Sequence, residues 1–334
     1  MSRFQLNLLT LCLAFVVITL GAFVRLSDAG LGCPDWPGCY GHLDVPTEAA
    51  DVAAANARFS ERPVEAPKAW KEMIHRYAAG ALGLLILLMA LAALRRSGDP
   101  HQQRVLPWVL LVLVIFQALL GMWTVTLLLK PLIVTAHLLG GMATFALLGW
   151  CLFRAGPLFA GWAATARRGL RVAAAAALVL LVGQIFLGAW TSTNYAALAC
   201  PDFPTCQTYW WPPTDFSTAF TLWHGLGINY EYGILESTPR ATIHWTHRLG
   251  AIVIAIVMLA LAAGLWRAGR VDGRWRGLAG TLAAALALQV ALGISVVEFH
   301  LPLSVAVAHN GGAALLLLTL VAINHAVWSA RRHV

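Results

Sequence analysis

The sequence has few charged residues: Asp, Glu, Lys and Arg make up only 11% of its 334 residues. An ordinary soluble domain carries about 25%. Hydrophobic residues make up 59% of the chain, which is more than a single soluble core would bury. This composition all but excludes a soluble enzyme with one core, and it also argues against a disordered chain. Much of the apolar surface must therefore face lipid.

The sequence also lacks a small-residue cleavage site after its first apolar segment, so we expect that segment to be a membrane span and not a signal peptide. Apolar runs of about 20 residues, each long enough to cross a bilayer of about 30 Å, recur along the chain. The pattern predicts an all-α integral membrane protein. Its eight predicted spans are residues 6–26, 73–94, 106–129, 132–153, 171–192, 242–266, 276–297 and 304–328.

Acidic residues are scarce on one side of this arrangement, where only Asp99 and Asp272 of the 15 acids fall. That side is cytoplasmic by the positive-inside rule, so we expect both termini inside and the loops 27–71 and 193–240 outside. Topology then accounts for the net charge of +8, and nucleic acid is not an expected partner. The same side holds 14 of the 23 basic residues: Arg3, Arg95, Arg96, Arg104, Arg154, Arg167, Arg168, Arg171, Arg267, Arg270, Arg274, Arg276, Arg331 and Arg332.

Four of the six cysteines fall in the two outer loops, as two pairs with the spacing C-x5-C. Neither pair has the C-x-x-C-H pattern of covalent haem attachment. The pairs Cys33 with Cys39 and Cys200 with Cys206 therefore predict two short disulfide loops in an oxidising compartment. A zinc site built from all four thiols is the alternative.

The sequence repeats itself. Residues 21–39 (GAFVRLSDAGLGCPDWPGC) match residues 188–206 (GAWTSTNYAALACPDFPTC) at an offset of 167. Later matches have an offset of 172, and each repeat contains four spans. The repeat predicts two four-helix bundles, residues 1–155 and 156–334, related by a pseudo-twofold axis along the membrane normal. The matches at the offset of 172 are His75, Arg76, Gln117, Gly121, His137 and Gly140 with His247, Arg248, Gln289, Gly293, His309 and Gly312.

Four histidines at equivalent repeat positions are expected near the outer ends of their spans. His75 and His137 belong to the first half, and His247 and His309 to the second. Paired imidazoles from two helices of one bundle suit a haem with two axial histidines. Two alternatives remain: each histidine snorkels or bonds a neighbour, or His244 adds a third ligand for non-haem iron or copper.

The residues around these histidines have both a functional and a structural interpretation. Arg76 and Arg248 would pair with haem propionates, or they would serve as snorkelling anchors. Four glycines follow the second histidine of each half and would let a macrocycle approach the backbone, or would simply allow close helix packing. These glycines are Gly140, Gly141, Gly311 and Gly312.

The two halves differ three residues before the first histidine. Glu72 precedes His75 on the same helix face, whereas His244 stands at the equivalent position before His247. The functional interpretation is that Glu72 handles protons beside a reacting group in the first half, while the second half holds a haem that passes electrons. The structural alternative is a carboxylate that is stabilised by the dipole at a helix start.

Over essentially its whole length the chain resembles the haem A synthase family. No single motif carries the resemblance, which rests on the combination of four histidines, eight spans and a Cys-bearing first outer loop. The matching segments are GLGCPDWPGCYG at 30–41, EMIHR at 72–76, AHLLGG at 136–141, ACPDFPTCQ at 199–207, IHWTHRLGA at 243–251 and AHNGG at 308–312.

The resemblance implies an enzyme that oxidises the C8 methyl group of haem O to a formyl group, through an alcohol and a gem-diol, for cytochrome oxidase. It places a resident haem b on His247 and His309 and the substrate haem on His75 and His137. Glu72 matches the important glutamate of the family.

The first cysteine pair, Cys33 with Cys39, matches one with a proposed redox or haem-transfer role. Cys200 with Cys206 matches only part of the family and is interpreted as a structural disulfide. The expected location is the bacterial inner membrane, with the cysteine loops in the periplasm or outside the cell. The expected partners are haem O from haem O synthase, lipid and an unidentified electron donor.

Two other functions are the alternatives: a di-haem b electron carrier, and a haem transporter or chaperone. An electron carrier of this kind usually places haems on both sides of the membrane, whereas all four histidines here are expected at the outer side. A transporter would show paired Gly or Pro interruptions of its spans near the membrane midplane, and the sequence has no clear ones. Residues 209–232, called the aromatic loop below, are expected to lie on the membrane surface or to form a lid over the second haem near His224. A homo-oligomer is compatible with the sequence.

Overall fold

The structure is a computed structural model that describes residues 2–95, 103–156, 158–159, 162 and 166–328. Arg96, Asp99, Arg331 and Arg332, used above to orient the chain, lie outside these residues. The described part is all-helical and contains eight helices long and apolar enough to span a membrane, which confirms the predicted fold class. They are α1 (Arg3–Leu26), α3 (Ala66–Leu94), α4 (Leu106–Thr126), α5 (Pro131–Arg154), α6 (Arg168–Thr193), α8 (Ser237–Ala268), α9 (Arg274–Glu298) and α10 (Leu303–Trp328).

Helices α3 and α8 begin earlier than the spans predicted at 73 and 242. Their first turns contain polar residues, so hydropathy did not assign them to the spans. Ala69 and Met73 nevertheless pack against the first cysteine pair, and Ala241 and Trp245 pack against the second. Contacts with the loops, in addition to apolar character, therefore extend these two helices beyond the expected spans.

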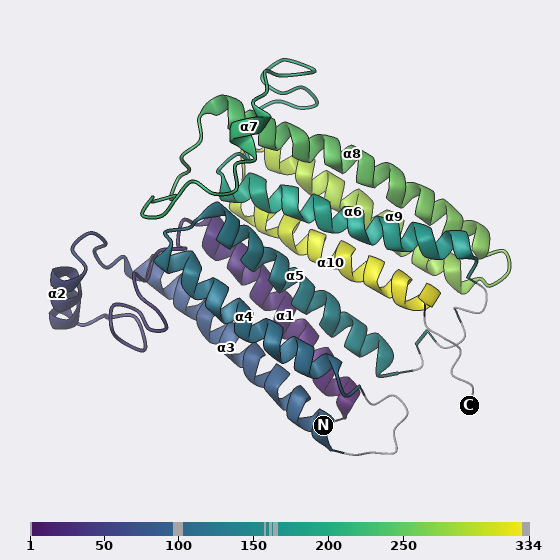
Figure 1. Cartoon of the computed structure of the whole chain (residues 1–334), viewed down its shortest axis with the longest axis horizontal. Helices are drawn as coiled ribbons and strands as arrows, with labels where there is room; N and C mark the ends of the chain where they lie inside the picture. The colour runs from purple at the N-terminus through teal and green to yellow at the C-terminus, as the bar shows by residue number, and fades with distance from the viewer. Residues whose placement is uncertain (1, 96–102, 157, 160–161, 163–165, 329–334) are drawn as a thin grey trace.

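Four spans pack in a closed ring in each half of the chain. Helices α3 and α5 both pack against α1 and α4, and α8 and α10 both pack against α9, while α6 closes the second ring against α8 and α10. Among the described residues, α3 does not pack against α5, and α8 does not pack against α10, because each pair is diagonal in its ring. Contacts of α10 with α1 and α5, and of α5 with α6, join the two rings (Figure 1). The pseudo-twofold relation between them stays a prediction.

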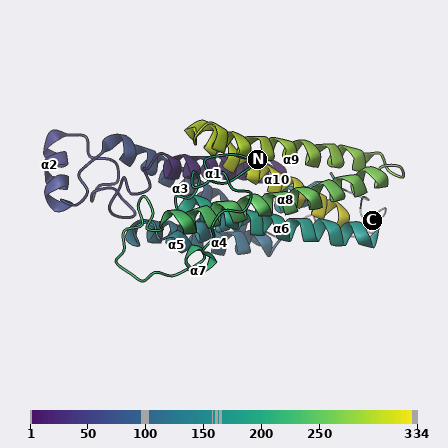
Figure 2. The same cartoon turned by 90° about the horizontal axis from the view of Figure 1, so that it is seen from above.

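Both predicted disulfides, Cys33–Cys39 and Cys200–Cys206, are present, which argues against a zinc site shared by the four thiols. Both lie in the loops at the same end of the helices, which we call the disulfide end. The first loop carries α2 (Ala49–Arg58), which stands clear of the spans (Figures 1 and 2). The second loop carries the one-turn helix α7 (Phe216–Ala219).

The aromatic loop extends from the second half to the first. Lys130, in the turn between α4 and α5, is 2% exposed, donates to the carbonyl of Gly225 and lies 3.0 Å from the centre of the Trp223 ring. Cation–π contacts of desolvated amines are worth about 2 kcal/mol. An ion pair of 2.7 Å joins Arg62 of the first loop to Glu231. The loop is thus attached to the first half, a contact that the sequence did not predict.

Candidate functional site

The four predicted histidines lie on the diagonal helices of the two rings. His75 on α3 and His137 on α5 are close enough to interact electrostatically, and the same holds for His247 on α8 and His309 on α10. The helices of each pair do not pack against each other, so each pair of histidines belongs to diagonal helices of one ring. All four side chains are half-buried. The structure therefore brings the histidines together in the expected pairs.

Each imidazole also rests against a glycine of the neighbouring helix. A Cβ at Gly21, Gly188 or Gly293 would crowd the ring, whereas one at Gly121 would make an ordinary contact, so three of the glycines leave room for the imidazoles in the interior. The distances from an ideal glycine Cβ to the imidazole Cε1 are 3.0 Å for Gly21 and His75, 3.5 Å for Gly121 and His137, 3.1 Å for Gly188 and His247, and 3.0 Å for Gly293 and His309.

These paired residues fit a haem in each ring. The buried Nδ1 atoms of His75, His137 and His309 have no hydrogen-bond partner among the described residues, so these are not satisfied core histidines. Two imidazoles on helices that do not touch would be the residues that hold a haem iron in each ring. In contrast, the described residues contain no group of three His, Cys, Asp or Glu able to hold a metal ion, which argues against non-haem iron or copper.

Glu72 is buried beneath the first disulfide loop, one helical turn before His75. Its Oε2 accepts a hydrogen bond of 2.9 Å from the backbone N–H of Cys33, and its Oε1 accepts one of 2.5 Å from Arg76. Its relative exposure is 4%. A carboxylate has about four lone-pair sites, so the carboxyl group can accept a further bond while it holds both partners. The structural alternative was a carboxylate stabilised at the start of a helix. Glu72 lies inside α3 instead, so that alternative does not describe its position.

His244 occupies the corresponding place in the second half. The backbone N–H of Cys200 lies 3.3 Å from its Nδ1, and Arg248 Nε lies 3.2 Å from its Nε2. Both ring nitrogens are thus engaged by the second disulfide loop and by α8, so His244 is not placed as a third metal ligand. The two halves share the structural contact to the loop, but only the first half has a carboxylate there.

Arg76 and Arg248 hold the disulfide loops. Arg76 Nη1 donates to three carbonyls of the first loop, at 3.0 Å, 3.2 Å and 2.5 Å. Arg248 donates to the carbonyls of Asp202, Thr205 and Cys200, at 2.8 Å, 2.7 Å and 2.7 Å. Both guanidinium groups are therefore occupied by loop carbonyls, a role that neither sequence interpretation anticipated. Their contact with haem propionates stays a prediction.

In each disulfide loop an aspartate side chain accepts hydrogen bonds from residues of the same loop. Asp202 accepts hydrogen bonds from Thr205 Oγ1 and from the backbone N–H groups of Gln207 and Thr208. Burial raises the pKa of Asp202, but these hydrogen bonds outweigh burial and hold the pKa below its ordinary value. Asp35 makes the equivalent backbone contacts in the first loop. The two loops are therefore built alike.

The Arg248→Met variant is expected to expose the second disulfide to reduction. Hydrogen bonds to charged groups are worth about 1.5–3 kcal/mol each, so losing three should speed thiol reduction of Cys200–Cys206 by about tenfold or more. Timed alkylation after addition of dithiothreitol, read by peptide mass, measures the rate. Cys33–Cys39 in the same molecules is the internal control, and equal rates in variant and wild type would contradict this role of Arg248.

The glycines after the second histidines do not all face the imidazoles. Gly140 and Gly312 lie against the side chains of Gln117 and Gln289. Gly311 instead faces Phe15 and Thr19 of α1, which is the helix-packing alternative. Of the other sequence candidates, Gly141 meets no atom within 4 Å of an ideal Cβ. His224 is half-buried in the aromatic loop.

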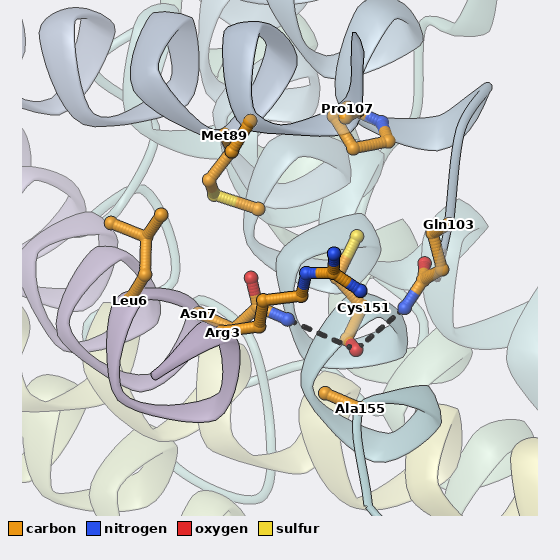
Figure 3. Close-up of a pocket in the computed structure, with 10 residues that line it drawn as sticks. Arg3, Leu6, Asn7, Met89, Gln103, Pro107, Cys151 and Ala155 are labelled. Carbon is orange, nitrogen blue, oxygen red and sulfur yellow. Dashed lines mark hydrogen bonds between the residues drawn. The ribbon is translucent and has the colours of Figure 1, made fainter. Parts of the chain in front are cut away.

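A small pocket of about 50 Å³ lies at the other end of the first ring (Figure 3). Asn7 Nδ2 and Gln103 Nε2 both donate to the carbonyl of Cys151, at 3.3 Å and 2.9 Å. These groups come from the ends of the helices opposite the disulfide end. The pocket is therefore separate from the histidine pairs.

Known proteins resemble the whole chain. The family model COX15-CtaA, described as cytochrome oxidase assembly protein, matches residues 5–321. A relative named heme A synthase from Shewanella oneidensis is 47% identical over 320 residues, which cover 96% of this chain and 95% of the relative. Heme A synthases from Rhizorhabdus wittichii and Halalkalibacterium halodurans are 26% and 27% identical, over 95% and 91% of this chain and 92% and 90% of their own lengths.

The family match and the 47% identity confirm the resemblance that was inferred from the sequence motifs. They agree with the eight helices able to span a membrane. The protein is a multi-pass membrane protein that belongs to the COX15-CtaA family of cytochrome oxidase assembly proteins.

Proposed function

We propose that the protein is a haem A synthase, an oxidoreductase that converts the C8 methyl group of haem O to a formyl group for cytochrome c oxidase assembly. The observation that carries this proposal is the unequal pair of sites: Glu72 stands beside the imidazoles of the first ring, and His244 stands in its place in the second. The relatives named heme A synthase support the same activity.

In this proposal His75 and His137 hold the iron of the substrate haem, and His247 and His309 hold a resident haem b. Haem iron, when bound, supplies the electron-transfer chemistry that the protein side chains lack. The role of the chain is to bind both macrocycles through imidazoles that approach from diagonal helices. The closed rings of apolar helices exclude bulk water from the space around them.

Glu72 is proposed to accept a proton at a carboxyl oxygen during oxidation of the methyl group and to release it afterwards. The Cys33 N–H and the Arg76 guanidinium fix the orientation of its carboxyl group, which makes the direction of proton transfer well defined. Arg76 also binds the loop that contains Cys33. The carboxyl group and the disulfide loop are therefore held as one unit above His75.

We also propose an orientation in the membrane. The disulfide end faces the periplasm or the cell exterior, and both termini are cytoplasmic, because basic residues are concentrated at the opposite ends of the spans and disulfides need an oxidising compartment. Haem O would come from haem O synthase in the same membrane. An electron donor of unidentified type would act together with the haem b site.

Extraction of the bound haems tests the proposed function. The protein is expressed in cells that make haem O, purified in detergent and extracted with acid–acetone, and the haems are separated by chromatography with mass detection. We expect haem b together with haem A or its hydroxymethyl precursor. Haem b as the only haem, from cells in which haem O is itself detected, would contradict the proposed activity and favour an electron carrier.

A further inference from the structure

Three of the four imidazoles share a local arrangement that involves a buried glutamine. The neighbouring helix carries the sequence Gln-x3-Gly, and the helix with the histidine carries His-x2-Gly. The first glycine lies against the imidazole, and the glutamine amide fills the space beside the second glycine, where a Cβ would overlap it. The sets are Gln117, Gly121, His137 and Gly140; Gln184, Gly188, His247 and Gly250; and Gln289, Gly293, His309 and Gly312.

The arrangement places an amide beside the imidazole in the second ring. Gln184 Nε2 lies 3.0 Å from His247 Nδ1 and 2.9 Å from the carbonyl oxygen of His247. Gln289 Nε2 lies 3.4 Å from Nε2 of His309, whose Nδ1 has no partner among the described residues. Each of the two amides has a second polar atom, Oε1, that is buried without a partner. The Gln184 contact is to Nδ1 and leaves Nε2 of His247 free for iron, whereas the Gln289 amide would have to move from Nε2 to Nδ1 of His309 when iron binds.

His75 lacks this arrangement. The repeat places Val17 where α6 has Gln184, and Ala78 where α8 has Gly250, although Gly21 still lies 3.0 Å from His75 Cε1. Val17 has no polar side-chain atom, and Ala78 carries a Cβ at the repeat position where a Cβ would overlap the amide in the other three sets. Nδ1 of His75 is buried and has no partner among the described residues. Nδ1 of His137 and His309 is unpartnered too, so what sets His75 apart is that it has no glutamine at the repeat position beside it.

We propose that Gln117, Gln184 and Gln289 are positioning residues for three of the four axial histidines, and that His75 is the releasable ligand through which the haem of the first ring is exchanged. This inference rests on the proposed function, because an enzyme must release its haem product while it keeps a resident haem. The resident site has both imidazoles beside glutamines, and the exchanging site has one.

The physical reason is the orientation of the ligand. A hydrogen bond to the outer nitrogen of a ligating imidazole fixes the tautomer and the plane of the ring, and its loss costs about 10–100-fold in metal affinity. An imidazole without that bond loses less order when the iron bond breaks and forms again. His75 should therefore dissociate more readily than His247, although both residues are of one type and lie in equivalent positions.

Haem transfer to excess apomyoglobin tests the inference on the purified full-length protein loaded with haem b in both rings. The wild type should release one haem quickly and the other slowly. The Gln184→Val variant copies the residue at the equivalent position of α1, and it should speed the slow phase about 10–100-fold without changing the fast phase. The EPR spectrum of the oxidised second haem should also shift, because it reports the relative orientation of the two axial imidazoles.

The reverse exchange is the matched control. Val17→Gln combined with Ala78→Gly installs the fourth glutamine and glycine, and it should slow the fast phase about tenfold. If this double variant does not fold, Gln184→Val decides by itself. An unchanged slow phase with an unchanged EPR spectrum in Gln184→Val would overturn the inference. Since release and EPR are measured with haem b, these results stand apart from the formation of a formyl product, which tests the proposed function.

Discussion

Glu72→Ala is expected to abolish haem A formation while both haem sites remain able to bind haem. A positioned general acid or base contributes about 10²–10⁴-fold to a rate, and Glu72 is the only carboxylate that the described structure places one turn from one of the four paired histidines. The measurement is the ratio of haem A and its hydroxymethyl precursor to haem O in extracts of the purified variant. A normal share of formyl haem would contradict the proposed role.

Glu72 also has a structural contact, so a second variant is needed. Removing one partner of a buried ion pair costs about 3–5 kcal/mol, and Arg76 would lose its partner in Glu72→Ala. Glu72→Gln keeps an acceptor for the Cys33 N–H but does not exchange a proton. If Glu72 handles protons, Glu72→Gln should be as inactive as Glu72→Ala; if Glu72 only holds the loop, Glu72→Gln should retain most of the activity.

The equivalent position of the second half provides a matched control. His244→Ala removes the side chain that contacts Cys200 and Arg248. It should loosen the second disulfide loop without the loss of formyl product expected for Glu72→Ala. Loss of product in both variants, with both disulfides intact, would show that the loop contacts and not the carboxylate are required.

His247→Ala is expected to remove the resident haem b, whereas His75→Ala should retain it and lose the haem of the first ring. A haem with two axial imidazoles loses one iron bond in either variant, and each ring has its own pair. Both variants should fail to make haem A. Haem content per chain and the identity of the extracted haem distinguish the two cases.

A third histidine serves as the control for these substitutions. His325 lies near the opposite ends of the spans, with its ring 4.9 Å from Trp150 and 5.4 Å from Phe159 between ring centres. His325→Ala removes a buried imidazole of the same size but should leave the haem content unchanged. The same loss of haem in His325→Ala as in His247→Ala would mean that haem content reports general instability and not ligation.

The principal features of the fold could be predicted from the sequence because they depend on local composition. Long apolar runs identify the eight spans, since backbone groups in lipid must bond within a helix. The repeat in the sequence is sufficient to match His75 with His247 and Glu72 with His244. The pairing of Cys33 with Cys39 followed from short spacing within one loop.

The partners of the polar side chains came only from the tertiary structure. Whether Arg76 meets a propionate or a loop carbonyl depends on how the first loop folds back over α3, and composition carries no information on that. The same is true of Lys130, whose contact with Trp223 joins two halves that are far apart in the chain. The alignment of the repeats shows Gln117 and Gln289 at equivalent positions, but it does not show that their amides lie against Gly140 and Gly312.

The local sequence pattern thus decided which segments cross the membrane and which residue types face the interior. Burial in lipid follows from the hydropathy of a segment, and burial in a bundle follows from the helical period of its apolar residues. Tertiary packing decided which imidazoles lie beside a glutamine. That contact needs two helices at a fixed separation, with a glycine on one helix to admit the amide from the other, as at Gly250 and Gln184. His75 differs because the repeat places Val17 and Ala78 where the second half has Gln184 and Gly250, and the meaning of that difference becomes visible only where the helices meet.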